Sequence, residues 1–157
     1  LPDSESIFMH FKHAYDFEYG PYYGKNYNFD GGVLEYSTNG GSDWLDAQTL
    51  MVANGYNGTI TANFGNPLGG RKAFVHSSHG YVSTKIDLSS LSGQNVRFRF
   101  RIGTDNTGDG LGWFIDDVKI YTCSAPDPLT IGLTYPNGSE VLKTGEVETI
   151  TWSSPSR

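Results

Sequence analysis

Apolar and charged residues alternate along the segment from Val96 to Ile102. The apolar positions are Val96, Phe98, Phe100 and Ile102, and an arginine fills each position between them. A period of two places these two sets on opposite faces of a β-strand, so the pattern predicts a strand with one face in the core. A second apolar run, Trp113 to Tyr121, follows a glycine-rich connection. We therefore predict that the two runs form an antiparallel hairpin with a long loop.

The same alternation appears near the start of the chain. Between positions 7 and 18, one side of the predicted strand carries Met9, Phe11, His13, Tyr15 and Phe17. His13 lies on this apolar side, where a hydrogen-bonded core histidine is the expected role. Further strands are predicted at 30–37, 72–76 and 80–88. No stretch keeps a helical apolar spacing for more than two turns, so the pattern predicts an all-β chain.

The composition supports this prediction and limits the classes of partner. The 157 residues include 20 glycines, 10 tyrosines and 9 phenylalanines, which is typical of strands joined by many turns. A formal net charge of -6 argues against nucleic acid as a partner, because phosphate binding depends on a basic surface. No apolar run has the length of a membrane span. An acidic extracellular surface fits this balance.

The chain length fits one domain and part of another. We predict a β-sandwich domain at 1–123, a proline-containing linker at 124–130, and the first strands of a truncated immunoglobulin-like module at 131–157. The linker prediction depends on two prolines close together after the last apolar run of the first domain.

The loop after Ile102 has the spacing of a calcium-binding segment. Asp105, Thr107 and Asp109 alternate, Gly110 follows, and Asp116 comes eleven residues after Asp105. Flanking strands in place of helices argue against an EF-hand. A hard cation bound by oxygen atoms is one interpretation, and the other is that these residues only form turns.

Asp116 is the strongest single candidate for a cation ligand. Its parity with Val118 and Ile120 predicts that it faces the core, where a carboxylate needs a cation or several donors to offset its desolvation. Glu18, at the end of the first strand, and Asp30, before two glycines, are further candidates if those segments lie beside it.

Aromatic and basic residues suggest a second kind of site. The loop at 19–29 holds more tyrosines than a connection needs, and we expect it either to contact a ligand or to cover the edge of the sandwich. Same-face arginines on a strand lie about 6.8 Å apart, and they would either bind repeated anionic groups or pair with carboxylates such as Asp117. The candidate ligand-binding residues are Tyr22, Tyr23, Tyr27, Trp44, Arg97, Arg99 and Arg101.

An enzyme is the least favoured class. The sequence contains no HExxH pair and no GxSxG elbow, and its adjacent Asp116 and Asp117 are predicted on opposite faces of a strand, which does not suit a pair of catalytic carboxylates. No catalytic residues are predicted.

Six motifs in order resemble a known type of module. FKHAYDFE, FDGGVLEYSTNGG, GYNGTI, FGNPLGGRKAF, VRFRFRIGTD and GWFIDDVKIY are similar to the jelly-roll accessory domains that follow fungalysin-type and immune-inhibitor-A-type peptidases. These domains are similar in turn to MAM and concanavalin-like sandwiches. The resemblance implies an all-β antiparallel jelly roll, and the tail TYPNGSEVLKTGEVETITW resembles the start of an immunoglobulin-like module.

The resemblance also implies a function and a cofactor. It implies a non-catalytic domain of a secreted bacterial metalloprotease that assists folding, docking or substrate contact, with the parent peptidase domain and extracellular protein as partners. Structural calcium is implied at Asp116 or Asp117, with Glu18 and Asp30 as co-ligands. Asp105 and Asp109 are added from the loop spacing. The alternative is a carbohydrate-binding module that contacts extracellular polysaccharide through the 19–29 loop and the arginine face.

Overall fold

The strand β1 (Ile7–Asp16) lies inside a four-stranded antiparallel sheet of the computed structural model. Its neighbours are β11 (Gly112–Thr122) and β9 (Val82–Asp87), and β6 (Met51–Ala53) pairs with the far side of β9. The inward side chains of β1 alternate with outward ones as the sequence predicted. Those that are buried along the strand are Ile7, Met9, Phe11, His13 and Tyr15.

A second sheet has the order β10 (Arg97–Gly103), β4 (Gly31–Ser37) and β5 (Leu45–Asp46). The strand β4 is buried on both faces. Leu34 belongs to the core shared with the first sheet, whereas Val33 points the other way into a smaller cluster with Ile60, Leu68, Ala73 and Val75. A strand covered on both sides does not show a simple alternation of apolar and polar residues.

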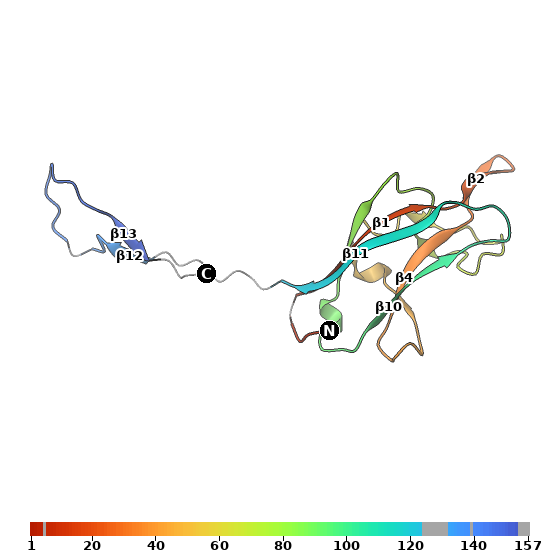
Figure 1. Ribbon diagram of the computed structural model, residues 1–157, viewed down its shortest axis with the longest axis horizontal. Helices are drawn as coiled ribbons and strands as arrows, with labels where there is room; N and C mark the ends of the chain where they lie inside the picture. The colour runs from red at the N-terminus through yellow and green to blue at the C-terminus, as the bar shows by residue number, and fades with distance from the viewer. Residues whose placement is uncertain (5, 124–131, 139, 154–157) are drawn as a thin grey trace. The chain divides into compact units, whose positions relative to one another are not determined.

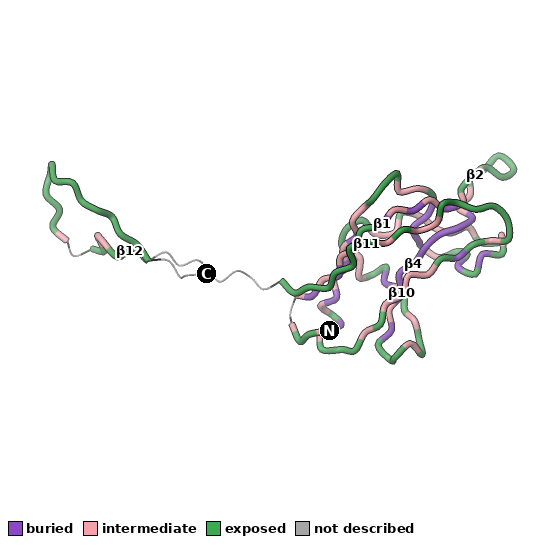
Figure 2. Tube along the Cα trace, viewed as in Figure 1, coloured by how far each residue is buried: buried purple, intermediate pink, exposed green. Residues whose placement is uncertain are grey.

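The main core lies between the two sheets, where Figure 2 shows the buried segments of β1 and β4. Phe11 of β1 meets Phe100 of β10 edge to face, with ring centroids 5.1 Å apart. Aromatic pairs in this geometry add to the stabilisation from burial. The predicted all-β antiparallel sandwich is confirmed, and the jelly-roll connectivity stays a prediction.

Shorter elements complete the first unit. They are the hairpin of β2 (Tyr19–Tyr22) and β3 (Lys25–Asn28), the pair β7 (Gly58–Thr59) and β8 (Lys72–Ala73), and the 3-10 turns η1 (Gln48–Leu50) and η2 (Ser89–Leu91). Figure 1 shows β2 extending from the body of the sandwich.

The structure describes residues 1–4, 6–123, 132–138 and 140–153. The chain divides into the units Leu1–Cys123 and Ser124–Arg157. The predicted linker at 124–130 lies outside the described residues. In the second unit β12 (Gly132–Tyr135) pairs with β13 (Thr151–Ser153), and the immunoglobulin-like assignment stays a prediction. In the part of the chain described here, no helix is long and apolar enough to cross a membrane.

The predicted hairpin between the Val96 and Trp113 runs is wrong. β10 pairs with β4 along its whole length, and β11 pairs with β1, so the two runs lie in different sheets. The connection between Gly103 and Gly112 therefore crosses from one layer of the sandwich to the other. Two neighbouring segments that both alternate between apolar and polar residues need not pair with one another.

The predicted inward orientation of Asp116 is also wrong. Ile115 lies opposite the inward-facing His13, so Asp116 faces outward opposite Lys12 and is exposed. The register then shifts: His10 pairs with Lys119, which leaves Asp117 and Val118 opposite Phe11. Asp117 has a positive φ of 51° at this bulge. The extra residue reverses the parity, because side chains in a strand alternate between faces.

The buried His13 is hydrogen-bonded on both ring nitrogens, as expected for a core histidine. Trp113 donates its indole N–H to Nδ1 at 3.0 Å, and Nε2 lies 2.9 Å from the hydroxyl of Thr84. The Thr84 hydroxyl in turn donates to the carbonyl of Asn54 at 2.7 Å. This chain of bonds fits a neutral ring protonated at Nε2. Burial lowers the pKa of His13 from 6.5 to about 4.

The shift makes His13 a source of acid sensitivity. Because the unfolded chain takes up a proton near pH 6.5 and the folded chain does not until about pH 4, stability is complete above the first value and falls between the two. The loss is about 3 kcal/mol at 1.36 kcal/mol per unit of pKa. Urea unfolding at stepped pH measures it. His13→Gln is expected to be less stable at pH 7 but to lack this pH dependence, whereas His10→Gln, on the outward face, is expected to keep it. Parallel pH profiles for His13→Gln and the parent chain would contradict the assignment.

Candidate metal centre

Three carboxylates meet at the end of the sandwich where the chain crosses between the sheets. Glu18 follows β1, Asp30 precedes β4 and Asp105 follows β10. Gly31 pairs with Gly103 in one sheet, and Asp16 pairs with Gly112 in the other, so the crossing loop passes over all three segments. One carboxylate oxygen from each of Glu18, Asp30 and Asp105 lies within 4.8 Å of the others. These three residues are called the carboxylate cluster below.

Backbone hydrogen bonds hold the cluster in place. The N–H of Asp105 donates to Oδ1 of Asp30 at 3.0 Å, and the N–H of Thr107 donates to Oδ1 of Asp105 at 2.8 Å. The N–H of Phe29 donates to the carbonyl of Glu18 at 3.1 Å. In contrast, Oε2 of Glu18 is buried and has no hydrogen-bond partner. A buried oxygen without a partner is costly, so Glu18 is positioned to accept a further contact.

The cluster carries uncompensated negative charge. Burial raises the pKa of Glu18, and the charges of Asp105, Asp30 and Asp109 raise it further. Burial also raises the pKa of Asp30. Because folding raises the pKa of these carboxyl groups, the folded state favours their protonated form. Their contribution to stability is complete below the ordinary pKa and is lost as the pH rises through the pKa of the folded protein. Over the described ranges, no lysine, arginine or histidine forms an ion pair with any of the three carboxylates.

The donor set suits a hard cation. The cluster offers only oxygen atoms, which calcium and magnesium prefer, and contains neither the cysteine nor the histidine that is common at zinc sites. Calcium takes six to eight oxygens in flexible geometry, and three carboxylates together with water or carbonyl oxygens can supply them. Magnesium demands a stricter octahedron and keeps more of its water. The residues present therefore fit calcium better than zinc or magnesium.

Solvent reaches the cluster from two sides. A pocket of about 400 Å³ is lined by Asp30 and Asp105 together with the exposed Asp109. A second pocket of about 370 Å³ is lined by Glu18, Asp105 and the aromatic rings of Tyr22 and Phe64. An ion therefore has an entry path. Asp109 lies close enough for its charge to raise the pKa of Glu18.

Three of the six predicted metal ligands, Glu18, Asp30 and Asp105, are thus brought together, Asp109 lies beside them, and Asp116 and Asp117 are not part of the cluster. Asp116 and Asp117 lie on β11, and Asp117 forms ion pairs with Lys12 at 2.8 Å and Lys119 at 3.3 Å. These partners lower the pKa of Asp117, with the hydrogen bond from Lys12 as the main cause. The spacing from Asp105 to Asp116 therefore does not describe one loop, because β11 carries Asp116 away from the crossing.

The predicted tyrosines lie on and beside the β2–β3 hairpin. Tyr23 at its tip is 89% exposed and Tyr22 is 48% exposed, whereas Tyr27 packs against Phe64 with ring centroids 5.1 Å apart. Phe64 was not among the predicted residues, since its own loop has no period that marks it. Tyr22 also meets Phe64 edge to face at 5.5 Å. The hairpin thus partly covers the loop beneath it and partly exposes aromatic rings.

The arginines of β10 are largely engaged within the protein. Arg99 bonds Glu35 through Nε at 2.6 Å and lies over the ring of Trp44, 4.1 Å from its centroid. Arg101 lies 3.9 Å from Glu35, which also binds Arg71 at 2.5 Å. Cross-strand pairing was predicted as one role for these arginines. The partner is Glu35, directly opposite Arg99 on β4 and not named in the prediction, whereas the carboxylate that was named, Asp117, pairs with lysines.

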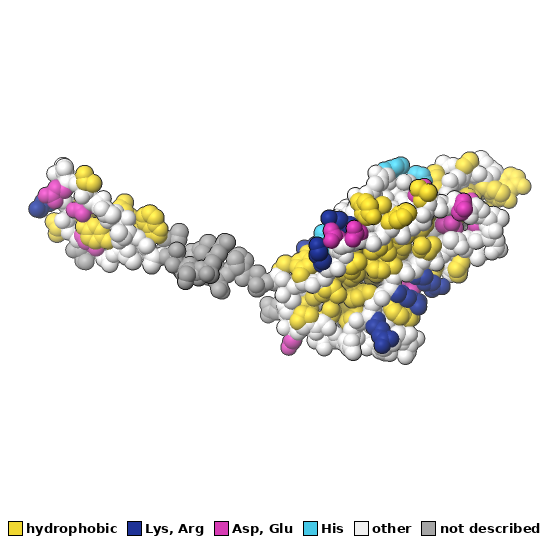
Figure 3. All heavy atoms as spheres, viewed as in Figure 1, with side chains coloured by type: hydrophobic (Ala, Val, Ile, Leu, Met, Phe, Trp, Pro, Cys, Tyr) yellow, Lys and Arg dark blue, Asp and Glu magenta, His cyan; other side chains and the backbone are white. Residues whose placement is uncertain are grey.

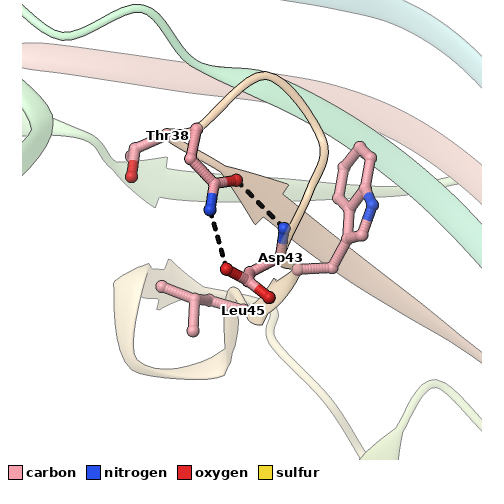
Figure 4. A pocket seen from close by; sticks show the side chains of 5 residues that line it. Thr38, Asp43 and Leu45 are labelled. Atoms are coloured by element: carbon pink, nitrogen blue, oxygen red, sulfur yellow. Dashed lines mark hydrogen bonds between the residues drawn. The ribbon is translucent and has the colours of Figure 1, made fainter.

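The turn after β4 borders another hollow of about 510 Å³, shown in Figure 4. Its polar groups are satisfied among themselves: Asn39 donates to the carboxylate of Asp43 at 2.8 Å and accepts from the Asp43 N–H at 3.0 Å. Trp44 lines the same hollow but has Arg99 over its ring. This arrangement stabilises the turn.

Comparison with known proteins connects the chain with a peptidase. No family model matches it, and no solved structure matches it. Bacillopeptidase F of Bacillus subtilis strain 168 is 26% identical over 145 residues, which is 90% of this chain. The chain spans about 8% of the length of that protein. The similarity therefore concerns one small part of a much longer polypeptide.

The close approach of the crossing loop to Glu18 predicts an unusual sensitivity at Gly108. A Cβ on Gly108 would lie within hard contact of the Glu18 carboxyl group, and φ there is +74°. Gly93 has φ +70° with no atom within 4 Å, so Gly93→Ala isolates the backbone cost of about 1 kcal/mol. Gly108→Ala is expected to cost more than Gly93→Ala in chemical unfolding, because the Glu18 carboxyl group must move aside. Equal losses in the two variants would show that the loop does not pack on Glu18 as described.

Proposed function

We propose that the unit 1–123 is a non-catalytic, calcium-stabilised accessory module of a secreted bacterial peptidase. The carboxylate cluster is the observation that carries the calcium part of this proposal. It joins the end of β1 in one sheet to the start of β4 and the end of β10 in the other. A cation bound there would connect both layers of the sandwich and neutralise their mutual repulsion.

The peptidase context is supported by similarity and not by chemistry within the chain. The similarity to Bacillopeptidase F covers 90% of the 157-residue chain. The name of that protein says that it is a peptidase but does not say to which catalytic class it belongs. The narrower proposal of a metalloprotease rests on the six sequence motifs. In this role the module assists folding of the parent enzyme, docks against its peptidase domain or contacts an extracellular protein substrate.

A thermal melt with calcium and with chelator tests the calcium part. Calcium at a hundredfold excess over its dissociation constant stabilises a folded protein by about 2.7 kcal/mol. The parent chain is expected to melt higher with calcium than with EGTA. Glu18→Gln and Asp105→Asn are expected to lose this shift, because each removes a charged oxygen ligand.

Asp116→Asn provides the matched control, since it removes an exposed carboxylate on β11 outside the cluster. It is expected to keep the full calcium shift. If calcium leaves the melting temperature of the parent chain unchanged, or if Asp116→Asn loses the shift as fully as Asp105→Asn does, calcium binding at the cluster is excluded.

A carbohydrate-binding module is the second candidate function. The exposed rings of Tyr22 and Tyr23 favour it, because aromatic faces stack on sugar rings. The arginine face supports it less, since Glu35 holds Arg99 and Arg101. A polysaccharide ligand would thus contact the tip of the β2–β3 hairpin, close to the pocket that Glu18 and Phe64 line.

Binding to a glycan array separates the two candidates. If the module binds sugar at the hairpin, Tyr22→Ala and Tyr23→Ala each weaken the affinity by about fivefold, in line with roughly 1 kcal/mol for a stacked ring. Tyr81→Ala is the control, because Tyr81 is also exposed but precedes β9. An array on which the parent chain binds nothing, or on which the three variants behave alike, rules out stacking by the hairpin tyrosines.

A further inference from the structure

On one side of the sandwich, each of the two sheets ends in a strand whose outer edge is unpaired. β10 ends the second sheet and β11 ends the first. Phe100 of β10 and Trp113 of β11 have ring centroids 5.4 Å apart, so the edges face each other across the core. We call the opening between them, bounded by Phe98, Phe100 and Ile102 on one side and by Val118 and Ile120 on the other, the edge seam.

Inward-facing apolar side chains remain uncovered along the edge seam. Val118 and Ile120, which face inward after the bulge, are 48% and 46% exposed, and Ile102 is also 46% exposed. Phe98 and Phe100 are only partly buried, although they pack on the core. Figure 3 shows hydrophobic side chains gathered in the region between β11 and β10. A contiguous apolar patch of this kind marks an interaction surface.

The edge of β10 is the better template for another strand. Its seven residues pair with β4 without a register shift, so alternate backbone N–H and C=O groups point regularly toward the open side. The edge of β11 is interrupted by the bulge at Asp117 and is flanked by the ion pairs of Asp117 with Lys12 and Lys119. Bulges and charges on an edge strand hinder further pairing.

The charge on the outer face of β10 determines which side chains a strand added at this edge must carry. Arg71, Arg99 and Arg101 pair with two carboxylates there, Glu35 and Asp46, and Arg97 lies on the same face of β10. This face is therefore basic, although the whole chain has a formal charge of -6. A second copy pairing β10 antiparallel with β10 would place arginines opposite arginines, which is unfavourable. Acidic residues on the outer face of the added strand would be favourable.

We propose that the edge seam binds an extended strand of a partner polypeptide, supplied in trans to this chain of 157 residues and paired antiparallel with β10. Its inward residues are apolar and cover Phe98, Phe100, Val118 and Ile120. Its outward residues are aspartate or glutamate and face Arg97 and Arg101. Seven paired residues correspond to a strand about 24 Å long. Backbone bonds supply affinity in this mode, and side chains supply specificity.

Synthetic nine-residue peptides with blocked ends test the proposal on the whole chain. One alternates valine with glutamate, a second alternates valine with lysine, and a third has the glutamate peptide's composition with all valines grouped together. The alternating glutamate peptide is expected to bind at least tenfold more tightly than either of the others in titration calorimetry. In the complex with this peptide, hydrogen exchange is expected to slow at β10. It is not expected to slow at β6, which is the edge strand of the first sheet on the side away from β11.

Variants locate the binding and exclude a second copy as the occupant. Val118→Glu places a charge in the edge seam and is expected to weaken binding of the glutamate peptide at least tenfold. Val52→Glu, at an exposed valine of β6, is expected to leave this binding unchanged. Arg97→Glu is expected to favour the lysine peptide instead. Melting curves verify that each variant is folded. The proposal is overturned if the glutamate peptide does not bind at millimolar concentration, if all three peptides bind equally, or if the chain forms a dimer that Val118→Glu dissociates.

Discussion

The packing of the inward row of β1 against β4 and β10 is the interaction on which the sandwich depends. Phe11 contacts Phe100, and His13 and Tyr15 contact Phe74, so one strand holds the aromatic centre of the core. These contacts fix how the two sheets are positioned against each other. They also make a polar group in the middle of β1 costly, which His13 avoids by bonding both Trp113 and Thr84.

The crossing between the sheets follows from that packing and creates the carboxylate cluster. Because β10 and β11 belong to different layers, the chain between them must pass over the end of the sandwich, where β1 ends and β4 begins. Glu18, Asp30 and Asp105 come together there for topological reasons. The glycines at 108 and 110 allow the loop to approach Glu18 and the backbone at Asp16 more closely than any side chain would permit. The cost is three like charges in a partly buried space.

The same topology leaves apolar side chains uncovered at two edges of the sheets. A sandwich whose layers end in β10 and β11 has two rows of inward-facing residues with cover on one side only, so Phe98 and Phe100 remain partly buried and Val118 remains half-exposed. The two edges differ in regularity. The bulge at Asp117 disrupts β11, whereas β10 stays straight in register with β4. Metal binding and strand binding would therefore use neighbouring parts of one framework, which meet at Ile102, a residue that also lines the pocket beside Asp30 and Asp105.

Much of the fold was accessible from the sequence, because alternation with a period of two is a local property. Alternation identified β1 and β10 and placed His13 in the core, and β4, β9 and β11 were predicted as further strand-like segments. It could not show which strands pair, so the predicted hairpin of β10 and β11 was wrong. A single extra residue at Asp117 reversed the face of Asp116, and no composition signal marks such a bulge. Likewise, Glu35 was not recognised as the partner of the arginines, since opposition across strands depends on register.

For the cluster, the sequence by itself determined the residue types, with acidic side chains at the ends of predicted strands and glycines in the crossing loop. Only the tertiary structure decided that Glu18, Asp30 and Asp105 converge, with Asp109 beside them, and that Asp116 and Asp117 do not join them. Convergence depends on contacts between segments up to 87 positions apart, from Glu18 to Asp105. The physical reason is that local periodicity fixes which face a side chain occupies, while burial of the shared core decides which faces and ends meet.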